Sequence, residues 1–398
     1  MKAWLIQCLA IVSLIIAYGA GIFKSQNDIE EKVKAQLPSK ALIKINSSPD
    51  VFTVLNKTTR QNQGWLVITE QQGWGGPMEV GAWINSSGTL ESLIILDHRE
   101  TPVFFEILEK RKYFDQYAQK SIQDPFQLHQ DIDGISGATV SSRAIAEATQ
   151  RSTHYWGRNH FKFAIEKTPM QWQIGANEFI LIVLYAVIVI SAVKKYRKIR
   201  YITLAFSIVF LGFYLSAPIS ISAFGALLMG YVPSISGQFF WWLLVSGAIL
   251  MAVILGRNLY CTWACPFGGI QEFIHRAGGM SVRVHPAVTR WATKIVYFLF
   301  WLAFMVMFLT DNPAIGTFEP FAALFSFKGS SLQWYLVSVT IFGSFIIPRF
   351  WCRFFCPVGL VLKKLAKTQK QILKRVPPQR PNSRRDQAET CIAQRQMV

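Results

Sequence analysis

The sequence predicts an exported α+β domain joined to an all-α membrane bundle of six transmembrane helices, including an N-terminal anchor. Three observations predict it: long apolar stretches, a hydrophilic segment of balanced charge, and basic loops that alternate with nearly uncharged ones. The chain of 398 residues is 51% hydrophobic and 16% charged, and its mean hydropathy is +0.27. Soluble proteins carry about 25% charged residues, so the composition indicates a membrane protein.

The first apolar stretch indicates a membrane anchor or a signal. Lys2 precedes an apolar run from Ala3 to Phe23, and no convincing small-residue cleavage site follows it, so we expect a retained anchor. The predicted segments are, in order, an N-terminal membrane anchor or signal (1–23), an exported domain (24–172), a five-helix membrane domain (173–362) and a basic cytoplasmic tail (363–398).

The exported segment is predicted to be an α+β domain in which strands and helices are mixed along the chain. The short runs Leu66–Thr69 and Ser92–Leu96, rich in aliphatic and β-branched residues, are typical of strands. The polar run Asn85–Gly88 is typical of a hairpin turn. Helical spacing of apolar residues predicts helices over Phe104–Tyr117 and Ser141–Tyr155.

Five further apolar stretches are long enough to approach a membrane span. A helix needs about 20 residues to cross about 30 Å of hydrocarbon. The predicted spans are residues 177–193, 202–224, 238–255, 293–309 and 331–348.

The charges of the connecting segments predict the orientation. Lys194–Arg200, Arg276–Lys294 and the tail are basic, whereas Gly230–Gly237 has no charge and Asp311–Ser331 holds a single Lys328. Basic loops stay in the cytoplasm, so we expect a bacterial inner-membrane protein whose exported domain lies in the periplasm.

The distribution of charge also bears on partners. Residues 24–172 carry 17 basic and 17 acidic residues, so the whole net charge of +18 belongs to the rest of the chain, where it borders apolar stretches. A nucleic-acid-binding domain would concentrate its charge on a soluble module. The pattern therefore indicates the lipid bilayer as a partner and excludes nucleic acid.

Two matching cysteine motifs follow two of the apolar stretches. They read Cys261-Thr-Trp-Ala-Cys265-Pro-Phe-Gly and Cys352-Arg-Phe-Phe-Cys356-Pro-Val-Gly, 91 residues apart. Thiolates at this spacing bind soft metals, and a proline after a cysteine is familiar from iron–sulfur sites. Each motif ends the second helix of a helical pair, so the repeat is expected to bring both motifs together at the cytoplasmic face.

The four cysteines are therefore predicted metal ligands, either for one cluster or as two pairs. Pro266 and Pro357 are expected to end their helices, and Gly268 and Gly359 to allow a tight turn that leaves backbone amides free to bond sulfur. Buried hydrophobic cysteines and a zinc site are the alternatives. A reducing cytoplasm disfavours a disulfide.

A second segment of interest is Asp133-Gly-Ile-Ser136-Gly137-Ala138-Thr139, which stands before a predicted helix. Its small residues would let another protein reach the threonine hydroxyl, and the following helix N-terminus would favour a phosphate. An ordinary Ser/Thr helix cap is the alternative from the residues alone.

These segments resemble a known family. Gly73–Gly76, Gly88, Asp97–Pro102 and Asp133–Thr139 are similar to the periplasmic FMN-binding domain of the flavin subunits of the Rnf and Na⁺-translocating NADH:quinone reductase complexes. The resemblance implies FMN joined through its phosphate to Thr139 by a flavin transferase. It implies that the flavin site comprises Thr139, Ser136, Gly137, Ala138, Glu100 and Thr101.

The architecture as a whole resembles the NosR family of membrane flavoproteins and relatives encoded near reductive dehalogenases. The resemblance covers nearly all of the chain and implies FMN and an iron–sulfur cluster as cofactors. Longer NosR proteins continue into a cytoplasmic ferredoxin domain, whereas the tail of this chain holds only Cys391. The expected donor is therefore quinol or a separate cytoplasmic ferredoxin, and the acceptor a periplasmic reductase or redox protein.

The function predicted from these features is electron transfer between cytoplasmic-side iron–sulfur centres, or quinol, and periplasmic FMN, for a reductase or its maturation. A membrane redox sensor or expression regulator is the main alternative. Charge topology opposes a thiol–disulfide carrier, and the absence of a charged residue near the centre of any predicted span opposes a transporter. One difficulty is that about 30 Å of hydrocarbon would separate the two sites.

Overall fold

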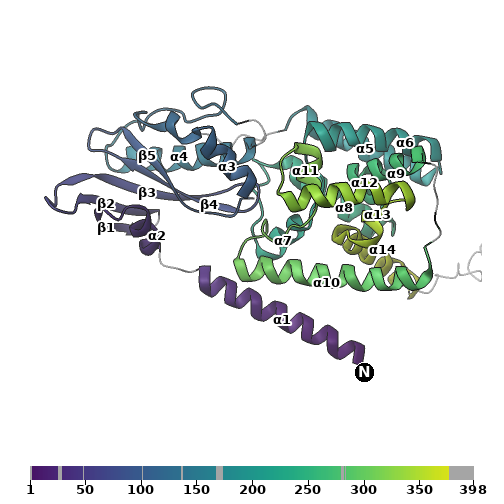
Figure 1. The fold of residues 1–398 in the computed structure, drawn as a ribbon. Coiled ribbons are helices and arrows are strands. Elements are labelled where there is room, and N and C mark those ends of the chain that lie inside the picture. The colour runs from purple at the N-terminus through teal and green to yellow at the C-terminus, as the bar shows by residue number, and fades with distance from the viewer. Residues whose placement is uncertain are drawn as a thin grey trace, which may run out of the picture.

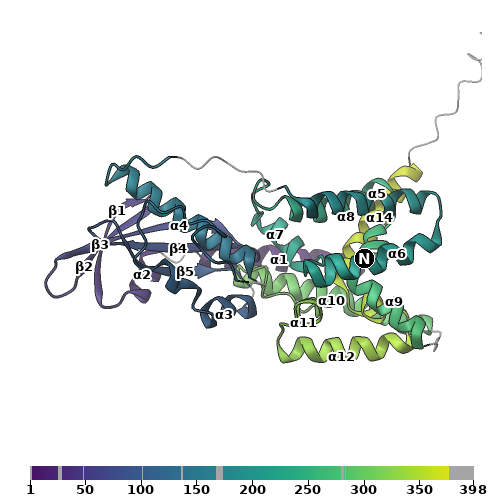
Figure 2. The same ribbon diagram turned by 90° about the horizontal axis from the view of Figure 1, so that it is seen from above.

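The computed structural model describes residues 2–25, 29–47, 49–100, 102–135, 138–166, 174–278, 282 and 284–375. A domain built on a β-sheet lies at one end of the molecule and a helical part at the other, end to end in both views (Figures 1 and 2). This arrangement confirms the predicted α+β domain followed by an all-α part.

The sheet is an antiparallel meander in which each strand pairs with the next along the chain. The predicted strands lie within β3 and β5, and the predicted hairpin turn joins β4 to β5. In this turn the Asn85 side-chain oxygen accepts hydrogen bonds from the backbone N–H groups of Ser87 and Thr89, both at 3.0 Å. The strands are β1 (Lys40–Ser47), β2 (Asp50–Asn56), β3 (Asn62–Gln72), β4 (Pro77–Ile84) and β5 (Leu90–His98).

Successive side chains of a strand point to opposite faces of a sheet, and β2 and β3 contain consecutive buried apolar residues, so each face of the sheet has its own core. On one face Val51 and Val67 pack beneath α4 (Thr139–Asn159), which covers β3 and β4. On the other face Phe52 and Leu66 pack with Val33 of α2 (Ile29–Gln36). The helix predicted at Phe104–Tyr117 divides into α3 (Pro102–Lys110) and a 3₁₀ helix η1 (Tyr113–Tyr117).

Three helices of the described residues are long and apolar enough to cross a membrane. Two predicted spans correspond instead to shorter apolar helices, α8 (Phe239–Ile254) and α12 (Ser331–Ile346). The three long helices are α1 (Lys2–Ser25), α5 (Ala176–Val193) and α10 (Pro286–Thr310).

The span predicted at residues 202–224 is wrong as a single helix. The segment forms α6 (Arg197–Ser207), a π-helical turn η2 (Ile208–Tyr214), a non-helical stretch and α7 (Ile221–Met229). Pro218 lies in the break, where it lacks a backbone donor and restricts the residue before it. The six-helix count predicted from hydropathy is therefore not confirmed.

The N-terminal helix α1 packs along α10 (Figure 1). The Trp301 indole N–H donates to the Ser13 hydroxyl at 3.0 Å, and the rings of Tyr18 and Phe308 lie 5.3 Å apart. A Cβ atom at Gly21 would lie 1.8 Å from the Phe308 carbonyl oxygen, so this close approach requires glycine.

Short helices carry and follow the cysteine motifs. A π-helical turn η3 (Tyr260–Ala264) precedes α9 (Pro266–Gly278), and α13 (Phe350–Phe354) precedes α14 (Pro357–Arg375). A further short helix, α11 (Phe321–Ser326), lies between α10 and α12. The tail beyond residue 375, with Cys391, lies outside the described residues.

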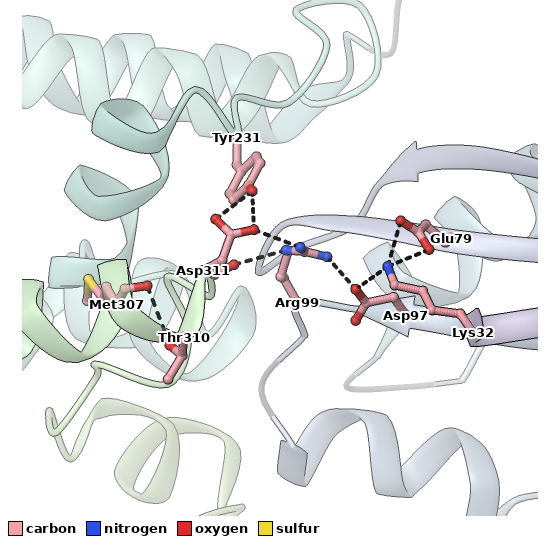
Figure 3. Close-up of polar contacts among 8 residues, drawn as sticks. All are labelled: Lys32, Glu79, Asp97, Arg99, Tyr231, Met307, Thr310 and Asp311. Carbon is pink, nitrogen blue, oxygen red and sulfur yellow. Dashed lines mark hydrogen bonds and ion pairs between the residues drawn. The ribbon is translucent and has the colours of Figure 1, made fainter. Parts of the chain in front are cut away.

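An ion pair joins the sheet domain to the helical part. The Arg99 guanidinium lies 2.8 Å from an Asp311 carboxylate oxygen and donates from Nε to the Asp311 carbonyl at 2.9 Å. The Tyr231 hydroxyl donates to the same carboxylate at 2.7 Å. On the domain side Asp97 bridges Arg99 and Lys32, as Figure 3 shows.

These contacts place two loops on the side of the sheet domain. Tyr231 belongs to the segment Gly230–Gly237, and Asp311 begins the segment Asp311–Ser331. The Gln238 side chain also donates to the Gly73 carbonyl at 3.4 Å. Both segments therefore contact the sheet domain, and the side of the membrane on which they lie stays a prediction.

The interdomain ion pair yields a stability prediction. The Arg99 and Asp311 side chains are 9% and 6% exposed. Arg99→Ala therefore removes the cation that faces the buried Asp311 carboxylate, and Asp311→Ala removes the buried partner of Arg99 while the partly exposed Asp97 remains. We expect Arg99→Ala or Asp311→Ala to lower stability by about 3–5 kcal/mol, and the double variant to lose less than the sum of the two. Thermal unfolding in detergent measures this loss of stability. Lys110→Ala is the control, because Lys110 forms an exposed ion pair with Glu106. Additive losses would contradict the coupling.

Candidate functional site

A cavity of about 670 Å³ lies between the sheet domain and the helical part, and we call it the interdomain cavity. Its volume is within the range of about 300–1,000 Å³ that small-molecule sites occupy. The domain contributes Trp74, Glu100, Ala138 and Thr139 to its wall. The helical part contributes, among others, Phe213, Pro218, Thr317, Glu319, Phe321, Phe325 and Lys328.

Thr139 is the first residue of α4 and faces this cavity. Its hydroxyl donates a long hydrogen bond of 3.3 Å to the Ile135 carbonyl, and it is exposed. The first backbone N–H groups of a helix lack partners within the helix, and the helix dipole adds partial positive charge there. The wall around Thr139 thus offers a reachable hydroxyl beside a place suited to a phosphate.

Glu100 organises the wall beside Thr139. Its buried carboxylate accepts hydrogen bonds from the backbone N–H groups of Trp74 at 2.6 Å and Gly75 at 3.3 Å. It also bonds the Ser141 side chain in the first turn of α4. One carboxyl group therefore ties the glycine-rich β3–β4 loop to the start of the helix that carries Thr139.

The predicted flavin residues are only partly described. Glu100, Ala138 and Thr139 meet in the wall of the interdomain cavity. Thr101, Ser136 and Gly137 lie outside the described residues.

The helical side of the cavity was not predicted from the sequence. Glu319 is 3% exposed, and its carboxylate accepts from the Ile221 N–H at 2.9 Å. Burial raises the pKa of Glu319 to about 8, so this carboxyl is largely neutral at neutral pH and would not repel an anionic phosphate. An acidic residue in the apolar segment Gly316–Ala323 was the available signal, but the sequence does not show which surface it meets.

These residues fit FMN. Aromatic side chains of Trp74, Phe213 and Phe325 give the cavity apolar walls, and Lys328 adds positive charge. The helix N-terminus at Thr139 suits the phosphate, and the volume is sufficient for the ring system.

Both cysteine motifs stand where the chain turns back after an apolar helix. Gly256, after α8, has a φ of 59°, and Arg349, after α12, has a φ of 55°. Each turn leads into a short helix that carries the first cysteine of its motif. Pro266 and Pro357 then begin α9 and α14 rather than ending a helix, which corrects the expectation from the sequence.

Polar contacts join the two motifs to each other. Arg349, just before the second motif, donates to the Cys261 carbonyl at 3.0 Å and to the Thr262 carbonyl at 3.2 Å in the first. Glu272, after the first motif, accepts from Arg349 Nε at 2.9 Å. The side-chain oxygen of Gln271 accepts from the Trp351 N–H at 2.8 Å. The repeat thus brings the motifs together, as predicted.

The surroundings of the thiols suit an iron–sulfur cluster. Gly359 N–H donates to the Cys356 sulfur at 3.3 Å, and Gln271 Nε2 to the Cys352 sulfur at 3.5 Å. A Cβ atom at Gly268 would lie 3.7 Å from both Cys265 Cβ and Cys352 Sγ, so cysteine side chains of both motifs meet beside this glycine. Among the described residues no three His, Cys, Asp or Glu side chains converge on one ion, whereas a cluster spreads its thiolates over several irons.

The cysteine motifs lie closer to the interdomain cavity than expected, because the sequence predicts that the whole thickness of the membrane would separate the two sites. Phe267, two residues after Cys265, has its ring centroid 5.0 Å from that of Phe321, which lines the interdomain cavity. Trp351, beside Cys352, lies 6.1 Å from Phe318 by ring centroids. Because the chain turns back after α8 and α12, the motifs reach the segment that faces the sheet domain.

Comparisons with known proteins agree with both sites. Residues 73–154 match the FMN-binding domain family. Residues 238–285 and 335–376 match the 4Fe-4S binding domain family, and these two stretches contain the two cysteine motifs.

Curated relatives share parts of the chain. Regulatory protein NosR of Stutzerimonas stutzeri is 25% identical over 41% of this chain and 24% of its own length. Protein NirI of Paracoccus denitrificans is 26% identical over 52% of this chain and 32% of its own. Putative electron transport protein YccM of Escherichia coli is 25% identical over 34% and 41%. The alignments thus span less than half the length of these relatives.

The two domain matches, the NosR and NirI relatives and the apolar helices agree with the cavity and the paired cysteines described above. The chain is therefore similar to NosR-type membrane flavoproteins, and a stretch that matches the FMN-binding domain family is followed by two stretches that match the 4Fe-4S binding domain family.

Proposed function

We propose that this protein, in the bacterial inner membrane, transfers electrons between an iron–sulfur site and a covalently bound periplasmic FMN. The iron–sulfur site is held by Cys261, Cys265, Cys352 and Cys356, and FMN is joined to Thr139 by a flavin transferase. Quinol or a cytoplasmic ferredoxin supplies the electrons, and a periplasmic reductase or redox protein accepts them. FMN supplies one- and two-electron chemistry, and the cluster supplies one-electron chemistry.

The observation that carries the proposal is the contact between the two sites. Phe321 and Phe325 line the interdomain cavity, and both have ring contacts with Phe267, at centroid distances of 5.0 and 6.4 Å. Phe267 lies two residues from Cys265. A continuous packed path of side chains therefore leads from the cysteines to the cavity that Thr139 faces.

Ion pairs between other residues fix the positions of the two sites relative to each other. Arg99 and Asp311 hold the sheet domain against the helical part, and Arg349 with Glu272 holds the two cysteine motifs together. The packing of α1 along α10 supports a retained N-terminal anchor.

A redox sensor or expression regulator is the second candidate, because the NosR relatives are named regulatory proteins. It would hold the same cofactors with little turnover. Reduction by quinol with an artificial periplasmic acceptor separates the two functions: sustained turnover supports electron transfer, and a protein that is reduced but does not turn over supports the sensor.

Covalent attachment of flavin gives the first prediction here. With a flavin transferase co-expressed, wild-type protein should fluoresce as a flavoprotein on a denaturing gel, and Thr139→Ala should lose this signal because the acceptor hydroxyl is gone. Thr317→Ala, which alters the opposite wall of the same cavity, is the matched control and should retain it. Fluorescence of the Thr139→Ala protein would place the linkage elsewhere.

Removal of a cysteine ligand tests the iron–sulfur site. Purified anaerobically, Cys265→Ser and Cys356→Ser should lose most of their iron and acid-labile sulfide together with the charge-transfer absorption, because each cluster iron needs its thiolate. Cys8→Ser, in α1, should keep the wild-type content. Equal iron in all four proteins would rule out this ligand set.

Glu100 makes the stability of the exported domain depend on pH. Burial raises the pKa of this carboxyl from 4.5 to about 7, against the opposing hydrogen bonds from Trp74, Ser141 and Gly75. Because the folded protein binds this proton more tightly than the unfolded chain, its contribution to stability is full below pH 4.5 and falls as the pH rises toward 7.

We therefore expect Glu100→Gln to remove a loss of stability of a few kcal/mol between pH 4.5 and about 7, since glutamine is neutral throughout and keeps an acceptor oxygen. Thermal unfolding over this pH range measures the effect, and Glu106→Gln, an exposed carboxyl, serves as control. A Glu100→Gln profile parallel to the wild type would show that Glu100 does not cause the slope.

A further inference from the structure

A second cavity, of about 620 Å³, opens beside the first cysteine motif, and we call it the basic cavity. It lies between the end of α8, the η3 turn and α14. Its wall includes the cysteine Cys261 and four basic residues, Arg257, Lys363, Lys367 and Lys370.

The charge of this wall is of one sign. Among the described residues that line the cavity there is no aspartate or glutamate. The lysines recur on one face of α14 at the spacing of a helical turn, and all three are exposed. Several like charges around one concave surface attract an acidic partner and raise its rate of encounter.

The cavity is also in contact with the proposed iron–sulfur site. Cys261 forms part of its wall, and Thr262 and Asn258 lie beside it. The side-chain amide nitrogen of Asn258 is buried and has no hydrogen-bond partner among the described residues, so a donor group is available at this wall. A bound partner would thus come within contact distance of a cysteine ligand.

We propose that the basic cavity is the docking site of an acidic, soluble one-electron carrier protein that exchanges electrons with the cysteine site. The inference rests on the proposed function and names the partner that acts at its cysteine end. One electron leaves the reduced carrier and enters the site held by the four cysteines. The carrier departs oxidised by one electron, and no bond is formed or broken.

The observations favour this occupant over two others. An uncharged quinol gains nothing from four cations, and no carboxylate or histidine of the described lining residues would take its protons. Anionic lipid headgroups are attracted to exposed lysines near a membrane, but lipid recognition does not explain a cysteine ligand in the cavity wall.

The test uses the full chain in nanodiscs of uncharged phosphatidylcholine, with a small acidic [2Fe–2S] ferredoxin as the probe. Fluorescence anisotropy of the labelled oxidised ferredoxin measures binding at low and at physiological ionic strength. Wild-type protein should bind, and its affinity should fall as salt increases, because the contact is electrostatic.

Charge reversal on the cavity wall should remove this binding. The Lys363→Glu/Lys367→Glu variant should bind about tenfold or more weakly. Lys364→Glu is the matched control, because this residue is on the same helix but lies over the Tyr297 ring, away from the cavity. It should keep its affinity to within about twofold. Equal binding by all variants, or none by wild type, overturns the proposal.

Two further measurements test whether lipid or quinol, rather than a carrier protein, occupies the basic cavity. Phosphatidylglycerol retained by wild type and lost by the double variant, without ferredoxin binding, would assign the cavity to lipid. Reduction by a water-soluble quinol at equal rates in both proteins, without ferredoxin binding, would assign the electron donor to quinol. Either result overturns the docking proposal.

Separate measurements report on the proposed function itself. Iron content and in-gel flavin fluorescence should be the same in wild type and all variants, which also shows that the variants fold. If dithionite reduces both sites but ferredoxin does not bind, the docking inference alone fails. If iron or flavin is missing from wild type, the proposed function fails.

Discussion

The ion pair between Arg99 and Asp311 is the interaction on which the arrangement of the two sites depends. It joins the end of β5 to the end of α10, and both side chains are nearly fully buried. A buried pair is held in place by the cost of leaving either charge alone. Since the walls of the interdomain cavity come from both parts of the chain, the cavity exists only while this junction is closed.

The residue next to Arg99 extends this constraint to the flavin site. Glu100 accepts hydrogen bonds from the β3–β4 loop and bonds the first turn of α4, so one short segment fixes both the junction and the wall around Thr139. A Cβ atom at Gly75 would lie 2.2 Å from the Arg99 carbonyl oxygen, which explains a glycine at that point of the loop. The glycines of this loop allow its backbone to pack closely against Arg99 and Glu100.

The cysteine motifs are arranged by a different constraint. Each follows a helix too short to be counted among the long spans, and a left-handed residue, Gly256 or Arg349, then turns the chain back. Arg349 also donates to carbonyls of the other motif, so the same residue makes the turn and joins the repeats. The broken segment at Pro218 lets Ile219 donate to the Tyr260 hydroxyl at 3.0 Å, beside the first motif.

The sequence by itself determined the fold class of the two parts and pointed to the two segments that match the FMN-binding and 4Fe-4S binding families, because these depend on composition and local spacing. It predicted β3, β5, the hairpin at Asn85 and α4, whose patterns are local. Tertiary structure decided the rest. The partners of Glu319 and Arg349, the break near Pro218 and the approach of Phe267 to Phe321 join residues that are distant in the chain, and no local pattern encodes which surfaces will pack together.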